Sequence, residues 1–296
     1  MTRPRDIKVI DTLMGFRSTS NIPSIPGLRD AGRADNTIGY MFKGMPANRP
    51  DEVSDEQAID ETLGKMDAHG IELALVNITS ETARTALVKH PERFAGSLAV
   101  DPNDVMGAVR EIRRAVAEHG LRAVTLFPSG LSPQVPIDDR HAYPIYATCV
   151  ELGLPVFVSV GVPGPRIPMA PQHVERVDQV CYDFPELVFV MRHGAEPWVD
   201  LAVKLLLKWP NLYYSTTAFA PRHYPAAIID YANTRGADKV IYGGYYPFGI
   251  ELERTFAELD GVPLKDMVWP KFLRHNAARV LGVGSDAGAE AGLGAS

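Results

Sequence analysis

The sequence predicts an α/β protein, a single (β/α)8 TIM barrel with a long loop after its first strand. Eight short apolar runs alternate with stretches of helical periodicity, which favours parallel βα units. The length of 296 residues fits one barrel, which typically takes ~250 residues. An open doubly wound sheet is the alternative, but no glycine-rich phosphate loop follows the first run, as a nucleotide-binding sheet would need.

The eight runs have the composition of strands that are buried on both faces. They are short, rich in Val, Ile, Leu and aromatic residues, and bounded by Gly, Pro or Asp. In chain order they comprise residues 8–14, 72–77, 94–100, 122–127, 155–161, 187–193, 212–217 and 239–246. Eight such strands predict a closed barrel rather than a smaller sheet.

Amphipathic stretches with recognisable ends lie between these runs. Ser54 is suited to cap a helix that ends at Gly70, and a helix from Asp104 ends in the same way at Gly120. Further helices fit residues 143–152, 173–182, 197–208, 224–234 and 250–259. The predicted barrel therefore has helices of ordinary length on its outside.

One connection, residues 17–50, is long and rich in Pro, Gly, Asn and Ser. Loops of this length in a compact domain tend to be functional or disordered. It contains Tyr40, Met41, Phe42 and Met45, which would form an apolar patch if they were exposed. We therefore expect them to cover the barrel mouth, as a lid or across a dimer interface.

Charge and hydropathy exclude two classes of partner. Nucleic acids and anionic membranes need a concentrated basic surface, whereas this chain has a net charge of −6 and no block of like charge. No apolar run reaches the ~18 residues that a membrane span needs. We expect a small-molecule substrate, with no nucleic acid and no membrane as partner.

The cysteines and the chain ends bear on location and domain organisation. Cys149 and Cys181 lie in apolar helical runs, which indicates buried thiols in a reducing compartment. The charged first residues lack the apolar core of a secretory signal, so a cytoplasmic location is expected. Residues 1–283 are predicted to form the barrel, and the Gly- and Ala-rich residues 284–296 a flexible tail.

Five motifs follow one another along almost the whole chain. They read VIDTLMGF at 9–16, GLPVFVSVG at 153–161, FVMRHGAEPW at 189–198, YGGYYP at 242–247 and NAARVLG at 276–282. The series resembles the amidohydrolase-related barrels, a family that includes aminocarboxymuconate-semialdehyde decarboxylase, resorcylate decarboxylases and hydrolases of small acids. The resemblance implies a TIM barrel with its chemistry at the carboxyl ends of the strands.

The chain departs from this family at the positions that the resemblance assigns to a catalytic metal. Those positions hold Leu13, Gly15, Ser159 and Tyr245, and only His193 matches the family's ligand set. A metal that activates water needs about three protein ligands, and Leu and Gly offer no ligating atom. We therefore expect neither a metal nor another cofactor.

Three residues are candidates for catalysis. His193 is placed by the resemblance at the end of the sixth strand and is suited to proton transfer near neutral pH. Tyr245 is suited to donate a proton or bind a substrate oxygen, or it fills the volume of the lost metal. Asp11 shares a strand face with residues 13 and 15 and is expected at the mouth, as a catalytic carboxylate or as a structural acceptor.

Six further residues are candidates for substrate binding. Arg17 and Arg192 are of the type that clamps a carboxylate, although the strand parity of Arg192, opposite to that of His193, points it away from the pocket. Polar side chains expected to line the same mouth are those of Thr125, Ser159, Thr217 and Tyr246.

These observations favour an enzyme over a scaffold, because a scaffold has no need of a polar barrel mouth. The favoured function is a metal-independent hydrolase or lyase, of decarboxylase or lactonase type, for a small cyclic or aromatic carboxylic acid. The alternative is a non-catalytic ligand-binding barrel or a partner subunit of an active homologue. A homo-oligomer, most simply a dimer, or a hetero-assembly with a related subunit is expected.

Overall fold

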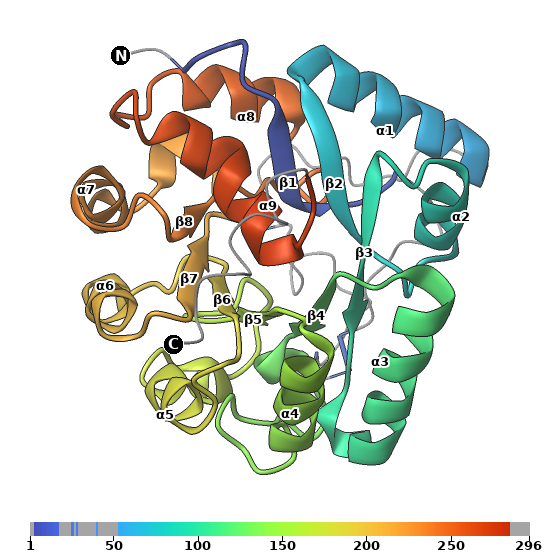
Figure 1. Ribbon diagram of the computed structural model, residues 1–296, viewed down its shortest axis with the longest axis vertical. Coiled ribbons are helices and arrows are strands. Elements are labelled where there is room, and N and C mark those ends of the chain that lie inside the picture. Colours follow the sequence, from blue (N-terminus) through green and yellow to red (C-terminus); the bar gives the residue numbers. More distant parts are fainter. Residues whose placement is uncertain (1–2, 18–24, 27, 29–39, 41–52, 285–296) are drawn as a thin grey trace, which may run out of the picture.

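Eight parallel strands form one sheet whose strand order follows the chain from β1 to β8, and the sheet curls into a nearly closed barrel (Figure 1). The computed structural model describes residues 3–17, 25–26, 28, 40 and 53–284. The strands are β1 Val9–Met14, β2 Ile71–Asn77, β3 Phe94–Ala99, β4 Ala123–Leu126, β5 Val156–Ser159, β6 Phe189–Arg192, β7 Leu212–Ser215 and β8 Val240–Ile241. The predicted (β/α)8 barrel is thereby confirmed.

Helices surround the barrel and alternate with its strands (Figure 1). They are α1 Asp55–His69, α2 Glu81–Lys89, α3 Val105–His119, α4 Tyr143–Leu152, α5 Arg176–Asp183, α6 Val199–Lys208, α7 Ala226–Thr234, α8 Leu252–Leu259 and α9 Asn276–Leu281. Short 3-10 turns lie at Pro102–Asp104, Pro128–Gly130, Ala170–Gln172 and Pro221–His223, and a π-helical turn at Lys271–His275 precedes α9. Helix α2 was not predicted from the sequence. None of the helices described is long and apolar enough to span a bilayer.

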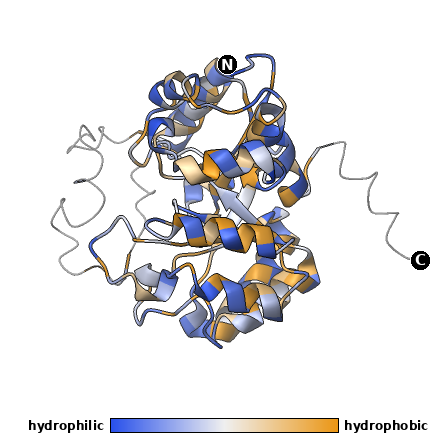
Figure 2. Ribbon diagram, turned by 90° about the vertical axis from the view of Figure 1, so that its left-hand side faces the viewer, coloured by the Kyte–Doolittle hydropathy of each residue, from blue (hydrophilic) through white to orange (hydrophobic). Residues whose placement is uncertain are grey.

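The ends of α1 show why these residues form a helix. The Ser54 hydroxyl accepts the amide of Gln57, and the Gln57 side chain accepts the amide of Ser54, so both amides are satisfied at the helix start. Gly70 ends the helix with φ of 70°, a conformation that favours glycine. Hydrophobic and hydrophilic residues alternate on the helices, as expected where one side packs on a sheet (Figure 2).

The hydrophobic core has two layers, one inside the barrel and one between barrel and helices. Seven strands each contribute one buried side chain to the interior layer: Ile10, Leu75, Ala95, Ala123, Phe157, Val190 and Ile241. Helix α9 closes the amino-terminal end of this layer with Ala277 and Leu281. Because side chains alternate along a strand, residues two and four positions after these face the interior nearer the barrel mouth.

Most of the long connection after β1 lies outside the described residues, including Met41, Phe42 and Met45. Tyr40 is described, and its hydroxyl donates to the carbonyl of Gly164 at 2.6 Å, in the loop that follows β5. The guanidinium of Arg166 lies 4.7 Å from the centre of the Tyr40 ring. Tyr40 thus contacts a loop at the carboxyl ends of the strands, the end at which a lid over the mouth was expected.

Candidate active site at the barrel mouth

The carboxyl ends of the strands surround an opening above the sealed interior layer. Ala99 ends β3 on its interior face, two positions beyond Ser97, yet its side chain is exposed. Asn77, the last residue of β2, and Phe127, directly after β4, have the interior parity of their strands and are partly exposed. Side chains that face the inside of a barrel and still reach solvent define an open mouth, the place where barrels of this type hold their chemistry.

Arg192 points into this mouth. It ends β6 with the same parity as Val190, an interior residue, and its Nε donates to the Ser159 hydroxyl at 3.3 Å. The expectation that its parity directs it away from the pocket is therefore wrong. No carboxylate of the described residues forms an ion pair with it. Burial lowers the pKa of Arg192 to about 10, so the guanidinium remains charged at neutral pH.

His193 follows directly and reaches the same mouth because the backbone turns there. Its φ is 70°, in the left-handed region, and its amide donates to the Thr217 hydroxyl at 3.2 Å. The buried Nδ1 has no hydrogen-bond partner among the described residues. Burial, with the adjacent Arg192 charge, holds the pKa of His193 well below its usual value of 6.5. The imidazole is consequently neutral at physiological pH.

Tyr245 lies beside His193, on the segment that follows β8. Its ring centre is 6.0 Å from that of His193, with the rings nearly perpendicular, and 5.6 Å from that of Phe248. Burial raises the pKa of Tyr245 to about 12, although the Arg192 charge opposes this shift. The phenol is therefore protonated at neutral pH, beside a neutral imidazole and a charged guanidinium.

Asp11 does not face the mouth, contrary to the expectation from its family position. Thr12 takes the interior direction, and its hydroxyl lies 3.0 Å from that of Ser215. The fully buried Asp11 carboxyl points to the outer layer, where its Oδ1 accepts the amides of Leu13 at 3.0 Å and Gly244 at 2.8 Å. Burial raises its pKa to about 7, and these two bonds oppose the shift. The structural alternative is favoured for this residue.

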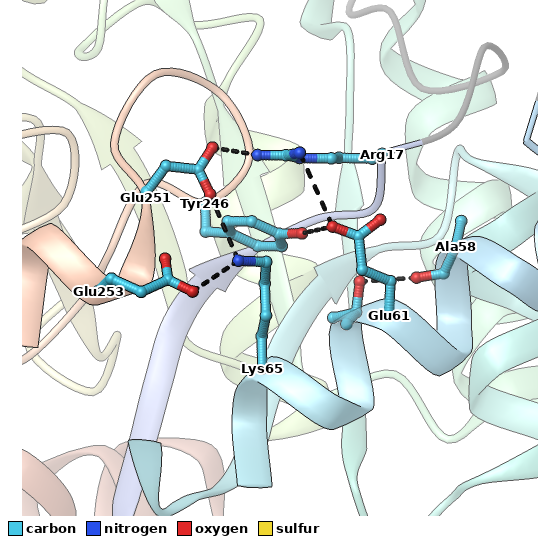
Figure 3. A network of polar contacts seen from close by, with 8 residues as sticks. Arg17, Ala58, Glu61, Lys65, Tyr246, Glu251 and Glu253 are labelled. Carbon is cyan, nitrogen blue, oxygen red and sulfur yellow. Dashed lines mark hydrogen bonds and ion pairs between the residues drawn. The ribbon is translucent and has the colours of Figure 1, made fainter. Parts of the chain in front are cut away.

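Arg17 and Tyr246 belong to a network of ion pairs outside the mouth (Figure 3). Arg17 pairs with Glu251 and lies 3.7 Å from the Glu61 carboxylate, and the Tyr246 hydroxyl donates to Glu61 at 3.2 Å. Lys65 of α1 is 3.6 Å from Glu251, which precedes α8. These partners hold both candidate substrate-binding residues against α1 and α8, which favours a structural role for the two side chains.

The smaller polar residues are more deeply buried than Arg192, His193 and Tyr245. Thr125, Ser159 and Thr217 are at most 5% exposed, all at the carboxyl ends of their strands or just beyond. Ser159 and Thr217 bind Arg192 and His193, so they orient the mouth residues from below. Sequence reasoning missed Asn77, Ala99 and Phe127, which counting by twos from the interior residues would have found.

The mouth does not fit the metal that the resemblance implies. No group of three or more His, Cys, Asp or Glu side chains in the described part of the chain is arranged to hold a metal ion. Leu13 and Gly15 lack ligating atoms, and the Asp11 carboxyl points to the outer layer. His193 alone is fewer than the about three ligands that a catalytic metal needs.

Comparison with known proteins gives one family and several related folds. A family model described as amidohydrolase matches residues 28–283. The curated 2-keto-4-carboxy-3-hexenedioate hydratase of Sphingobium sp. (strain NBRC 103272 / SYK-6) is 31% identical over 121 residues. That match spans only 35% of this chain and 36% of the hydratase.

Three solved structures resemble the whole barrel. An uncharacterized TIM-barrel protein of Bordetella bronchiseptica has a TM-score of 0.75 at 24% identity, covering 93% of this chain and 99% of its own. The 5-carboxyvanillate decarboxylase of Sphingomonas paucimobilis has a TM-score of 0.65 at 16% identity, covering 94% and 100%. The 4-oxalomesaconate hydratase of Rhodopseudomonas palustris has a TM-score of 0.61 at 20% identity, covering 93% and 95%. At these identities the likeness is one of fold.

Proposed function

The chain belongs to the amidohydrolase family, and from this premise we propose that it is a hydrolase or lyase that acts, without a catalytic metal, on a small cyclic or aromatic carboxylic acid. The family model covers residues 28–283, nearly the whole barrel. The names of the hydratase and of the decarboxylase compared above both denote carboxylic acids as substrates. The fold leaves the chemistry open, so the proposal depends on the residues of the mouth.

Arg192 is the observation that carries the proposal. The partly exposed guanidinium has no anionic partner among the described residues, and its Nε donates to the Ser159 hydroxyl, which leaves its other N–H groups able to bind a ligand. A carboxylate satisfies two N–H groups of a guanidinium at once and neutralises its charge. Ala99 and Phe127, at the same end of the barrel, are exposed and partly exposed respectively, so this end is accessible to such an acid.

His193 and Tyr245 supply the proton transfers. The neutral imidazole of His193, a partly exposed residue, accepts a proton from water or from the substrate at a ring nitrogen. The protonated phenol of Tyr245 donates a hydrogen bond to an oxygen on which negative charge develops. General acid–base help of this kind contributes roughly a hundred- to ten-thousand-fold in rate.

A carboxylate-binding barrel without turnover is the second candidate. The replacement of the family's ligand positions by Leu13, Gly15 and Tyr245 favours it. Both candidate functions use the Arg192 site to bind an acid. Only an enzyme converts the bound acid to product, so a turnover assay distinguishes the two.

The test is a thermal-shift screen of aromatic acids, their uncharged amides, and lactones. A ligand present at 100 times its Kd stabilises the folded protein by about 2.7 kcal/mol. We expect acids to raise Tm and the amides to have no effect. Arg192→Met should abolish the response, whereas Arg110→Met, at an exposed position of α3, should retain it. Acids that stabilise Arg192→Met as well as wild type would contradict the proposal. Each acid or lactone that binds is then incubated with the protein and assayed for decarboxylated, hydrated or hydrolysed product.

A further inference from the structure

The seam between β8 and β1 differs from the other junctions of the barrel. Ladders of backbone hydrogen bonds join each pair from β1–β2 to β7–β8, and none joins β8 to β1 among the described residues. Side chains of β1 bind the backbone after β8 instead. The Thr12 hydroxyl donates to the Tyr242 carbonyl at 2.9 Å, and the Gly244 amide donates to Asp11 Oδ1 at 2.8 Å.

The bonds across this seam bracket Tyr245. Gly244, immediately before it, is held by Asp11, and the carbonyl of Tyr246, immediately after it, accepts the amide of Gly15 at 2.9 Å. A Cβ atom at position 244 would lie 2.6 Å from Asp11 Oδ2, so the close approach of the carboxyl requires glycine there. The backbone on both sides of Tyr245 is thus fixed to β1.

Asp11 is able to act on this segment but not on a substrate. It is fully buried in the outer layer beside Tyr242, whose ring packs on Phe256 of α8. Its Oδ1 also accepts the Leu13 amide, at the point where the register between β1 and β2 slips. One carboxyl oxygen therefore holds two backbone amides that the sheet leaves without acceptors.

Resting on the role proposed above for Tyr245, we propose that Asp11 is a positioning residue: its carboxyl group closes the seam between β8 and β1 and thereby holds Tyr245 in the barrel mouth. The group is required as a hydrogen-bond acceptor, not as a charge. Asn provides the same acceptor oxygen without a charge. Ala leaves two buried amides without acceptors.

The test uses the full chain labelled with 3-fluorotyrosine, with the Tyr245 resonance assigned from Tyr245→Phe. We expect Asp11→Ala to shift or broaden this 19F resonance and to speed amide exchange over residues 242–248 roughly tenfold or more, because the segment loses its anchor. Asp11→Asn should reproduce the wild-type resonance and exchange. As a matched control, Thr62→Ala removes a buried hydroxyl of α1 that donates to the Ala58 carbonyl, and it should leave both readouts unchanged.

A folded Asp11→Ala protein with the wild-type Tyr245 resonance and exchange would overturn the inference, and so would an Asp11→Asn protein that behaves like Asp11→Ala. If Asp11→Ala does not fold, amide exchange is measured on the wild-type protein. The Leu13 and Gly244 amides should be protected from exchange, and unprotected amides would refute the inference. The function proposed for Tyr245 fails separately, if Tyr245→Phe retains wild-type turnover of the acid that the screen identifies.

Discussion

The three side chains of the mouth owe their protonation states to one another and to burial. The Arg192 charge adds to the desolvation that keeps His193 neutral, and it opposes the rise in the pKa of Tyr245. At neutral pH this leaves one fixed cation, one proton acceptor and one proton donor side by side. A carboxylate bound to Arg192 would neutralise that cation and thereby raise the pKa of His193 towards its usual range.

Replacement of His193 tests the proton acceptor. We expect His193→Ala to fold normally and to lose at least ~100-fold in kcat with the acid that the screen identifies, with a milder loss in Tyr245→Phe. The measurement pairs kcat with Tm on the same preparation. A purely structural histidine would give the reverse pattern, a lower Tm with unchanged turnover per folded molecule.

The ionisation of Asp11 predicts how stability depends on pH. Its pKa rises from the usual 3.8 to about 7 in the folded protein, so the folded state binds this proton more tightly than the unfolded state does. Ionisation therefore opposes folding increasingly between pH of about 4 and about 7, and fully above that. Asp11→Asn cannot ionise, so its Tm relative to wild type should rise over this interval and then level off. His193 titrates in both proteins and cancels in the difference; a difference that is constant with pH would contradict the assignment.

At the scale of elements, the end of β6 decides which residues enter the mouth. Arg192 is the last strand residue and faces inward by parity, and the left-handed turn at His193 brings the next side chain to the same opening. Ser159 of β5 and Thr217 after β7 support the pair from the neighbouring strands. The network of Arg17, in contrast, joins the end of β1 to α1 and α8 (Figure 3).

Because Arg192 points into the mouth and Arg17 lies in the ion-pair network, replacing Arg17 should have the opposite effect on acid binding to replacing Arg192. Arg17→Gln should lower Tm by a few degrees at most, because partly exposed ion pairs contribute ~0–1 kcal/mol and a third of this side chain is exposed. Its response to aromatic acids in the thermal-shift screen should equal that of wild type. If Arg17→Gln loses the response to aromatic acids, Arg17 binds the substrate after all.

At the scale of the whole molecule, the chain keeps the barrel of its family, while the described residues include no group of three metal-ligating side chains. The interior layer, which includes α9, and the outer layer contain none of the residues at the family's ligand positions. Tyr245 occupies one of those positions, at the mouth of the barrel beside His193.

Metal content tests this description of the intact protein. We expect purified protein to contain far less than one zinc, manganese or iron per chain by elemental analysis, and a chelator to leave Tm unchanged. The reason is that His193 alone does not meet the about three ligands required. One tightly bound metal per chain, with a Tm that falls on chelation, would point to ligands outside the described residues.

The sequence by itself determined the barrel, because alternating strands and helices follow from local patterns of hydropathy, capping and glycine. It also selected His193 and Tyr245 as candidate catalytic residues, through their family positions, and the structure places their ring centres 6.0 Å apart. The sequence did not predict correctly which way the side chains at the strand ends point. The slip in register after Asp11 and the positive φ at His193 change the parity on which such predictions depend. The open seam, the outward Asp11 and the inward Arg192 arise from contacts between residues far apart in the chain, so only the tertiary structure decided them.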